Sequence, residues 1–346
     1  MQMRVPVVDG RGIPLMPCTP PKARALLNAG QARPKRNKLG LFYLQLTYAQ
    51  EPKNQPLVVG VDPGSTFEGF SVVGRADTVL NLMVEAPTHV KKAVETRRTL
   101  RRARRFRLWR RPCRSQNRLI RQHRLPPSTR SRWDAKARVI QQLCAILPLT
   151  DAAVEDVQAA TRPGKGGRWN TAFSPVQVGK AHLYGMLTAM GLTLHLFPGV
   201  VTSHLRIQYG LSKTRQKDRR DFSSHAVDAW VLAASVSGAT TPSCTRLWYG
   251  VPTHMRRRQL HRLQAEKGGF RKPYGGTRSL GWKRGTLVRH LRCGLCTIGG
   301  CDREKQRLSL HAYRTNKRLT QTAKPADCAR LTALAFRCWL IPLKQV

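Results

Sequence analysis

The chain has 346 residues, 62 of them Lys or Arg and 18 Asp or Glu, which gives a formal net charge of +44. Self-repulsion of this size excludes an ordinary soluble domain that has no polyanionic partner. Because the basic residues are spread over the whole length, the partner is expected to be large, and nucleic acid fits best. No apolar run approaches the roughly 20 residues of a membrane-spanning helix, so no membrane partner is expected.

The beginning of the chain and its cysteines predict a cytosolic protein. Residues 1–6 lack the apolar core of a secretory signal. The nine cysteines are therefore expected to be reduced thiols.

Residues 1–48 predict a small module, followed by a polar, proline-containing linker at 50–56. Its helix begins with Pro20 after a capping Thr19, and Gly30 is its stop signal. The other expected elements are a strand at 4–8, a basic loop at 33–38 and a strand at 41–48.

From residue 57 onward, three strands precede alternating helices and strands, which predicts an α/β sheet with helices packed on it. The strands are expected at 57–62, 67–73, 78–85, 152–157 and 192–197. The helices are expected at 91–124, 133–146, 175–190, 202–209 and 221–236. This is the element order of an RNase H-like fold, in which two central strands and a later helix converge on one site. Residues 241–346, with short apolar runs at 285–291 and 307–312, predict a small β-rich domain.

Four residues stand where a two-metal nuclease needs them. Asp62 and Glu155 each end an apolar strand, and His225 and Asp228 share one face of an apolar helix at i and i+3. A carboxylate among buried apolar residues is costly unless it is neutralised. Hard divalent cations with oxygen ligands do so, and two of them can clamp a phosphodiester.

In this interpretation two ions lie about 3.5–4 Å apart, with Mg²⁺ favoured by availability and Mn²⁺ possible. Asp62 is assigned to both ions, Glu155 to one and Asp228 to the other, and His225 is a metal neighbour or a proton shuttle for the attacking water. The alternative is that acidic residues here form helix caps and surface ion pairs, a role that we expect for Asp151, Asp156, Asp218 and Asp221.

Residues 91–124, with 15 Lys or Arg in 34 residues, predict an arginine-rich helix. Basic side chains at this density repel one another, so the helix is expected to be stable mainly when phosphates surround it. A solvated basic arm is the alternative, and its ligand is again nucleic acid. The residues expected to contact nucleic acid are Arg97, Arg98, Arg101, Arg102, Arg104, Arg105, Arg107, Trp109, Arg110, Arg111, Arg114 and Arg118.

Cys293, Cys296 and Cys301 have a spacing near that of a zinc knuckle. No fourth ligand is fixed, because His290, His311 and Cys328 compete for the role. The same stretch predicts a strand, a turn and a strand around Gly294 and the pair Gly299-Gly300, so zinc is not the favoured interpretation. The isolated His182, His195 and His204 are expected to be core or surface residues.

Several of these motifs resemble the IscB and IsrB families, transposon-encoded relatives of the type II CRISPR effector nucleases. The sequence at 14–17 is similar to their PLMP motif, 60–65 to their first RuvC segment, 91–124 to their bridge helix, 154–156 to their second RuvC segment and 225–229 to their third. IscB proteins insert an HNH nuclease between the last two segments. Here only 69 residues separate Glu155 from His225, without a His-Asn-His set, so the chain is more similar to IsrB.

The resemblance implies an RNA-guided nickase of a bacterial or archaeal cytosol, nucleoid-associated when bound to DNA. A noncoding guide RNA (ωRNA), one protein per RNA, would pair with one strand of double-stranded DNA, and the single RuvC site would cut the displaced strand. The implied domains are PLMP (1–54), RuvC segment I (55–90), the bridge helix (91–125), RuvC segments II and III (126–240) and a domain that reads the target-adjacent motif (241–346). Two alternatives stay open: a guide-free RuvC-like nuclease and a non-enzymatic RNA-binding protein.

Overall fold

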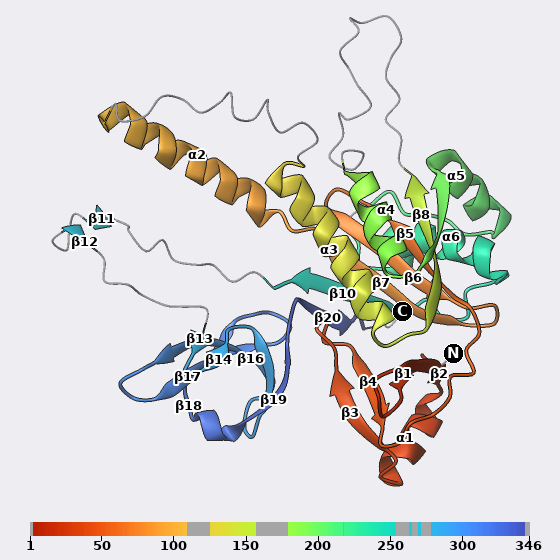
Figure 1. Cartoon of the computed structure of the whole chain (residues 1–346), viewed down its shortest axis with the longest axis horizontal. Coiled ribbons are helices and arrows are strands. Elements are labelled where there is room, and N and C mark those ends of the chain that lie inside the picture. Colours follow the sequence, from red (N-terminus) through yellow and green to blue (C-terminus); the bar gives the residue numbers. More distant parts are fainter. Residues whose placement is uncertain are drawn as a thin grey trace, which may run out of the picture.

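The computed structural model describes residues 3–108, 125–156, 179–216, 218–253, 263–264, 269–270 and 278–342. It is a mixed α/β protein in which two smaller sheets flank a seven-stranded sheet (Figure 1). Within these ranges no helix is long and apolar enough to cross a membrane.

The N-terminal module is a four-stranded sheet in the order β2-β1-β4-β3, with one helix packed on it. Its elements are β1 (Val5–Val8), β2 (Pro14–Cys18), α1 (Pro20–Asn28), β3 (Ala32–Arg36) and β4 (Phe42–Leu46). Helix α1 begins at Pro20 with Thr19 at the N-cap position, as predicted, but the Thr19 side chain makes no capping hydrogen bond. The predicted basic loop at 33–38 is wrong, because most of it is β3. Among the described residues this strand pairs only with β4, and a sheet edge can expose Lys and Arg side chains that an interior strand could not.

The large sheet has the order β20-β10-β7-β6-β5-β8-β9. Its strands are β5 (Leu57–Asp62), β6 (Phe67–Val73), β7 (Thr78–Glu85), β8 (Leu149–Asp156), β9 (Thr193–Pro198), β10 (Leu247–Pro252) and β20 (Phe336–Leu340). The first three strands begin and end where the sequence predicted, and β8 and β9 confirm the other two. Strand β5 is antiparallel to β6 and parallel to β8, so the sheet is mixed.

The helices include those that cover both faces of this sheet and α2, which extends away from it (Figure 1). They are α2 (His89–Leu108), α3 (Pro127–Cys144), α4 (Lys180–Ala189), α5 (Gly199–Gln208), the π-helical turn η2 (Phe222–Ala226) and α6 (Val227–Ser237). One face packs against α3 and α4 in a core that includes Trp133, and the other packs against α6 around Trp230. Residues alternate between the faces along a strand, so Val59 and Val61 meet α3 and α4 while Val58 meets α6.

Helix α6 lies directly on the sheet because glycines replace side chains between them. A Cβ at Gly60 of β5 would come within 1.7 Å of the Ala229 carbonyl oxygen. A Cβ at Gly69 of β6 would come within 2.3 Å of the His225 carbonyl oxygen. The backbone of η2 and α6 therefore reaches the end of β5, where Asp62 lies.

The C-terminal residues are β-rich, as predicted, but they do not form one separate unit. Strands β10 and β20 extend the large sheet, since β10 is parallel to β7 and β20 is antiparallel to β10. A five-stranded sheet in the order β18-β17-β16-β15-β19 lies between them in sequence. Its strands are β15 (Thr286–His290), β16 (Gly294–Asp302), β17 (Arg307–Ala312), β18 (Arg318–Ala323) and β19 (Cys328–Ala333). The short strands are β11 (Leu263–Gln264), β12 (Gly269–Phe270), β13 (Arg278–Ser279) and β14 (Trp282–Lys283).

A buried ion pair ties α3 to β6. The Lys136 ammonium donates to Glu68 Oε1 at 2.9 Å, and both side chains are 2% exposed. The same ammonium lies 4.5 Å from the centre of the Trp133 ring. Burial raises the pKa of the Glu68 carboxyl above its ordinary value, although the charge of Lys136 opposes the rise.

Replacing Gly60 with Ala is expected to destabilise the chain by about 3 kcal/mol or more, because the new methyl group overlaps backbone that cannot yield like a side chain. The measurement is the free energy of unfolding from denaturant titration. Gly185→Ala is the matched control: nothing lies within 4 Å of its Cβ position in α4, and the variant is expected to gain about 0.5–1 kcal/mol. A Gly60→Ala chain as stable as the wild type would contradict the close approach.

Lys136→Met is expected to cost about 3–5 kcal/mol, because it leaves the Glu68 charge buried and unpaired, whereas Lys136→Met with Glu68→Leu recovers most of the loss. Without Lys136 the folded-state pKa of Glu68 rises further. The folded state then binds a proton that the unfolded state releases, so the single variant loses stability as pH rises above 4.5, the ordinary pKa. Unfolding measured from pH 5 to pH 8 tests this; a loss independent of pH would contradict it.

Candidate active site

Two of the predicted site residues come from neighbouring strands of the large sheet. Val61 of β5 is paired with Val154 of the parallel β8, so the following residues, Asp62 and Glu155, leave the two strands side by side. Both carboxyl groups lie on the α6 face, two residues beyond Gly60 and Ala153 respectively. The Asp62 side chain is buried, and Glu155 hydrogen-bonds to it.

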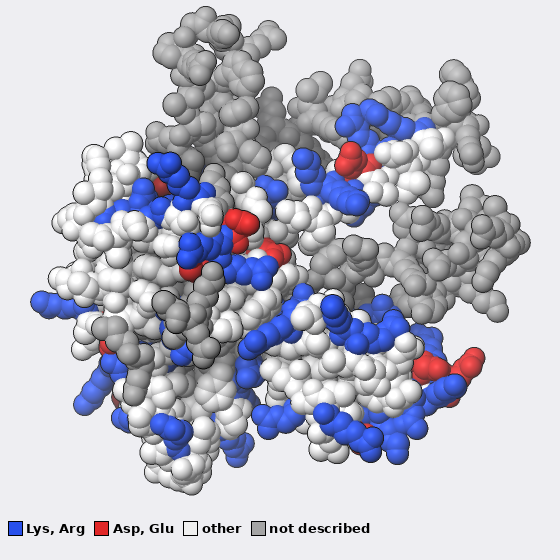
Figure 2. Space-filling model, turned by 180° about the vertical axis from the view of Figure 1, so that it is seen from behind, with Lys and Arg blue, Asp and Glu red and all other residues white. Residues whose placement is uncertain are grey.

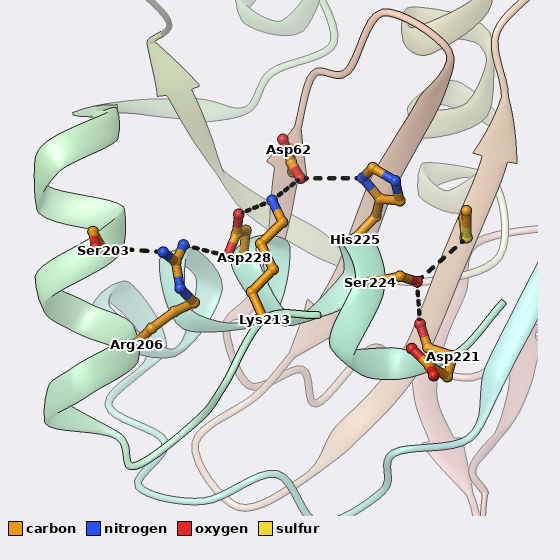
Figure 3. A network of polar contacts seen from close by, with 9 residues as sticks. Asp62, Ser203, Arg206, Lys213, Asp221, Ser224, His225 and Asp228 are labelled. Carbon is orange, nitrogen blue, oxygen red and sulfur yellow. Dashed lines mark hydrogen bonds and ion pairs between the residues drawn. The ribbon is translucent and has the colours of Figure 1, made fainter. Parts of the chain in front are cut away.

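The other two predicted residues come from the segment that packs on these strands. His225 belongs to η2 and Asp228 to the first turn of α6, so the predicted single helix begins with a π-helical turn. His225 Nδ1 lies 3.7 Å from Asp62 Oδ2. The Asp228 side chain is 3% exposed and points toward Asp62 (Figure 3). The structure therefore brings all four predicted residues to one place.

Two basic residues complete the cluster. The Lys213 ammonium, from the loop after α5, donates to Asp228 Oδ2 and lies 3.4 Å from Asp62 Oδ2 (Figure 3). The Arg206 guanidinium, from α5, donates to Asp228 Oδ1 at 2.6 Å. Sequence reasoning did not find either residue. In a chain with 62 Lys and Arg, nothing in their spacing distinguishes these two from the rest.

Crowding of three carboxyl groups changes their protonation. Burial raises the pKa of Glu155 to about 8, and the negative charges of Asp62 and Asp228 add to the rise. Burial alone would also raise the pKa of Asp62, but the hydrogen bond from His225 and the charge of Lys213 outweigh it, so this pKa is lowered. At neutral pH Glu155 is therefore mostly protonated and donates its proton to the ionised Asp62.

Lys213 stays charged in the cluster. Burial by itself lowers the pKa of its ammonium, but the carboxylates of Asp62 and Asp228 more than compensate, so the pKa is raised. The site thus holds a cation between two buried carboxylates.

The donor set of this cluster fits a hard divalent cation, because Asp62, Glu155 and Asp228 offer only oxygen atoms. The ammonium of Lys213 marks the position where a cation is stabilised between Asp62 and Asp228. Within the described ranges, no three Asp, Glu, His or Cys side chains are arranged, as they stand, to hold a metal ion. A metal ion between Asp62 and Asp228 would have to take the place of this ammonium group.

Three of the other acidic residues make the local contacts expected of structural groups. Asp151 accepts a hydrogen bond from Thr150 and lies 2.8 Å from His195 Nε2. Asp156 accepts from Lys180 at 2.5 Å and from Tyr184 at 2.7 Å, which joins β8 to α4. Asp221 stands at the N-cap of η2, although its carboxylate accepts from Ser223 rather than from a backbone amide.

The arginine-rich stretch is helical as far as the structure describes it. Helix α2 projects from the body of the molecule in Figure 1, and Arg97, Arg98 and Arg102 are exposed on it. The remaining predicted contacts lie outside the described side chains; they are Arg101, Arg104, Arg105, Arg107, Trp109, Arg110, Arg111, Arg114 and Arg118. Lys and Arg predominate over Asp and Glu on the face shown in Figure 2.

The cysteine-rich segment forms the predicted strand, turn and strand: β15 and β16 pair around Gly294. His290 Nδ1 accepts hydrogen bonds from the backbone amides of Arg292 and Cys293 at 3.2 and 3.1 Å. The ring proton of neutral His290 therefore lies on Nε2, which leaves that nitrogen no lone pair for zinc. This geometry argues against His290 as the fourth ligand and leaves the other two candidates, Cys328 and His311, untouched.

Comparison with known proteins shows similarity to a family model and to solved structures. The family model described as "RRXRR protein" matches residues 5–171, just under half of the chain. The chain carries Arg-Arg-Ala-Arg-Arg at 101–105, inside the matched range, which fits the letters of that description. Among solved structures, T. thermophilus RuvC in complex with a Holliday junction substrate is similar at 16% identity and a TM-score of 0.29, over 54% of this chain and 99% of that one. No curated protein matches the chain.

Lys213→Met is expected to raise the affinity of the chain for Mn²⁺ about tenfold, because the competing ammonium is removed while Asp62 and Asp228 keep their charges. Free Mn²⁺ measured by electron paramagnetic resonance gives the affinity without any reaction. Lys22→Met, on the exposed face of α1, is the matched control and leaves the affinity unchanged. Equal Mn²⁺ affinity in the wild type and Lys213→Met would show that the ammonium does not occupy the cation position.

Proposed function

We propose that the chain is a metal-dependent DNA endonuclease, specifically an RNA-guided nickase. The observation that carries the proposal is the meeting of Asp62, Glu155, Asp228 and His225 at the end of β5. Three carboxyl groups crowded together at a buried site, beside an imidazole, are costly for folding. They are explained if the site binds cations and a phosphodiester.

Each residue of the cluster has a proposed role that follows from its position. Asp62, Glu155 and Asp228 would hold two divalent cations, Mg²⁺ or Mn²⁺, which when bound supply Lewis-acid stabilisation of the phosphodiester and activation of water. Glu155, whose pKa is raised to about 8, would release its proton to water on becoming a ligand. His225, which contacts Asp62 at the edge of the site, accepts the proton of the attacking water.

Nucleic acid as both substrate and partner follows from the charge. A formal +44 needs a polyanion much larger than one short DNA segment at the site, and exposed arginines on α2 offer a second contact surface. The resemblance to IscB and IsrB supplies the finer proposal: a noncoding guide RNA pairs with one DNA strand while the protein holds the backbone. One nuclease site then cuts only the displaced strand.

Two alternatives make different use of the same residues. A guide-free nuclease would cut without RNA, and the exposed arginines of α2 would then serve the DNA alone. A non-enzymatic RNA-binding protein would explain the charge, but it has no use for the buried carboxyl cluster. The cluster therefore favours an enzyme, and the RNA requirement separates the first alternative from the proposal.

The test is strand-specific cleavage by the protein purified with the RNA that accompanies it. The chain is expressed with its flanking genomic DNA, and labelled duplex DNA matched to the bound RNA is offered with Mg²⁺. We expect a nick confined to the strand that the RNA does not pair with. Asp62→Asn is expected to abolish the nick, and His225→Ala to slow it by about 100-fold or more.

Asp151→Asn is the matched control. Asp151 lies near the opposite end of β8 from Glu155 and pairs with His195, so its variant is expected to nick like the wild type. Cleavage that persists after the RNA is removed would favour the guide-free nuclease. A discrete bound RNA without cleavage of any DNA would favour the RNA-binding protein.

A further inference from the structure

A cavity of about 920 Å³ opens beside the carboxyl cluster. Pockets of roughly 300–1,000 Å³ are typical of small-molecule binding sites. Phe67 lines the cavity and also touches the cluster, since its ring centre lies 5.6 Å from that of His225. Asp221 and Phe222, at the beginning of η2, form another part of the wall. The cavity and the candidate active site therefore share one short turn of helix.

One wall of the cavity is a stacked pair of side chains. The Arg220 guanidinium lies 4.2 Å from the centre of the Tyr249 ring. The Tyr249 hydroxyl donates to Glu85 Oε1 at 2.5 Å, which fixes the ring, and Tyr249 is only 1% exposed. Arg220 is exposed, so the outer face of its planar guanidinium is presented to the cavity. Guanidinium planes and aromatic rings are the surfaces on which proteins stack unpaired bases.

The charges of the cavity indicate a neutral ligand group. Three arginines and three carboxylates line it: Arg219, Arg220, Arg246, Glu85, Asp218 and Asp221. Arg219 is paired with Asp221, and Glu85 accepts the Tyr249 hydrogen bond. A phosphate would find no net positive charge here, in contrast to the chain as a whole.

One residue of the cavity wall has a side-chain donor that the described part of the chain leaves unpaired. Arg246 Nε is shielded from solvent and has no hydrogen-bond partner in the described part of the chain. A shielded donor of this kind is costly unless a ligand acceptor meets it. Nucleobases present ring nitrogens and carbonyl oxygens as acceptors, together with a flat face that can stack on Arg220.

We propose that this cavity binds a nucleobase of the single DNA strand that the site cuts, turned out of its stack, with the adjoining phosphate at Asp62. The proposal rests on the proposed function, because the strand placed in the cavity is the one that the carboxyl cluster is proposed to cut. Holding one base beside the site fixes the neighbouring phosphodiester relative to Asp62 and His225. Arg220 is thereby a positioning residue for the strand.

Photochemical cross-linking locates the base without requiring cleavage. A deoxyribose homopolymer of 5-iodouracil is bound to the full-length chain in EDTA, so that every register presents the same base, and is irradiated. We expect cross-linked peptides that contain Phe67, Phe222 or Tyr249. An abasic deoxyribose-phosphate strand of equal length is expected not to displace these cross-links, whereas a thymidine strand displaces them.

Arg220→Lys keeps the charge but removes the stacking plane. It is expected to lower the yield of the cavity cross-links about fivefold or more and to leave other cross-links unchanged. Arg215→Lys, on the same connecting segment but outside the cavity, is the matched control. Any of three results would overturn the proposal. Cross-links could appear only outside the cavity, they could be unaffected by Arg220→Lys, or they could form in the cavity only with a ribose strand. Because metal is excluded, a chain that cross-links here but never nicks DNA would refute the nickase and not the base-binding cavity.

Discussion

The close approach of α6 to β5 is the constraint on which the candidate site depends. Gly60 and Gly69 leave no side chain between the sheet and the backbone of η2 and α6. A layer of ordinary side chains would hold sheet and helix about 10 Å apart, and His225 and Asp228 could not reach Asp62. The two glycines thus allow His225 and Asp228, which are 163 and 166 positions from Asp62 in the sequence, to lie next to it.

The candidate site concentrates acidic groups, whereas the chain as a whole is strongly basic. A chain of net charge +44 concentrates three carboxyl groups at one buried point, and the structure relieves their repulsion in two ways. Glu155 retains a proton, and Lys213 and Arg206 hold Asp228. The retained proton and the two cationic side chains both indicate a site that stabilises added positive charge. The same Lys213 explains why a cation must compete for its place.

Sequence reasoning predicted the parts of the fold in which one strong pattern dominates. The strands at 57–62, 67–73 and 78–85 have correct ends because apolar runs stop at turn residues. The strand at 32–36 was missed, since a basic edge strand resembles a loop in composition. Strands β10 and β20 join the large sheet through long-range strand pairing, which no local sequence pattern predicts. Asp62, Glu155 and Asp228 stood out in the sequence because carboxylates are rare in this chain, and the structure brings them together with His225. Lys213 and Arg206 were missed because basic residues are common.

The central claim is that phosphodiester hydrolysis takes place at these carboxyl groups with metal ions bound to them. The most direct measurement is cleavage of the matched DNA with one non-bridging oxygen of the scissile phosphate replaced by sulfur. Magnesium ligates oxygen much better than sulfur, whereas softer manganese tolerates sulfur. The account predicts that the replacement slows cleavage strongly in Mg²⁺ and that Mn²⁺ restores it, with no restoration in Asp228→Ala. Equal slowing in both metals, or cleavage that survives Asp228→Ala, would contradict it.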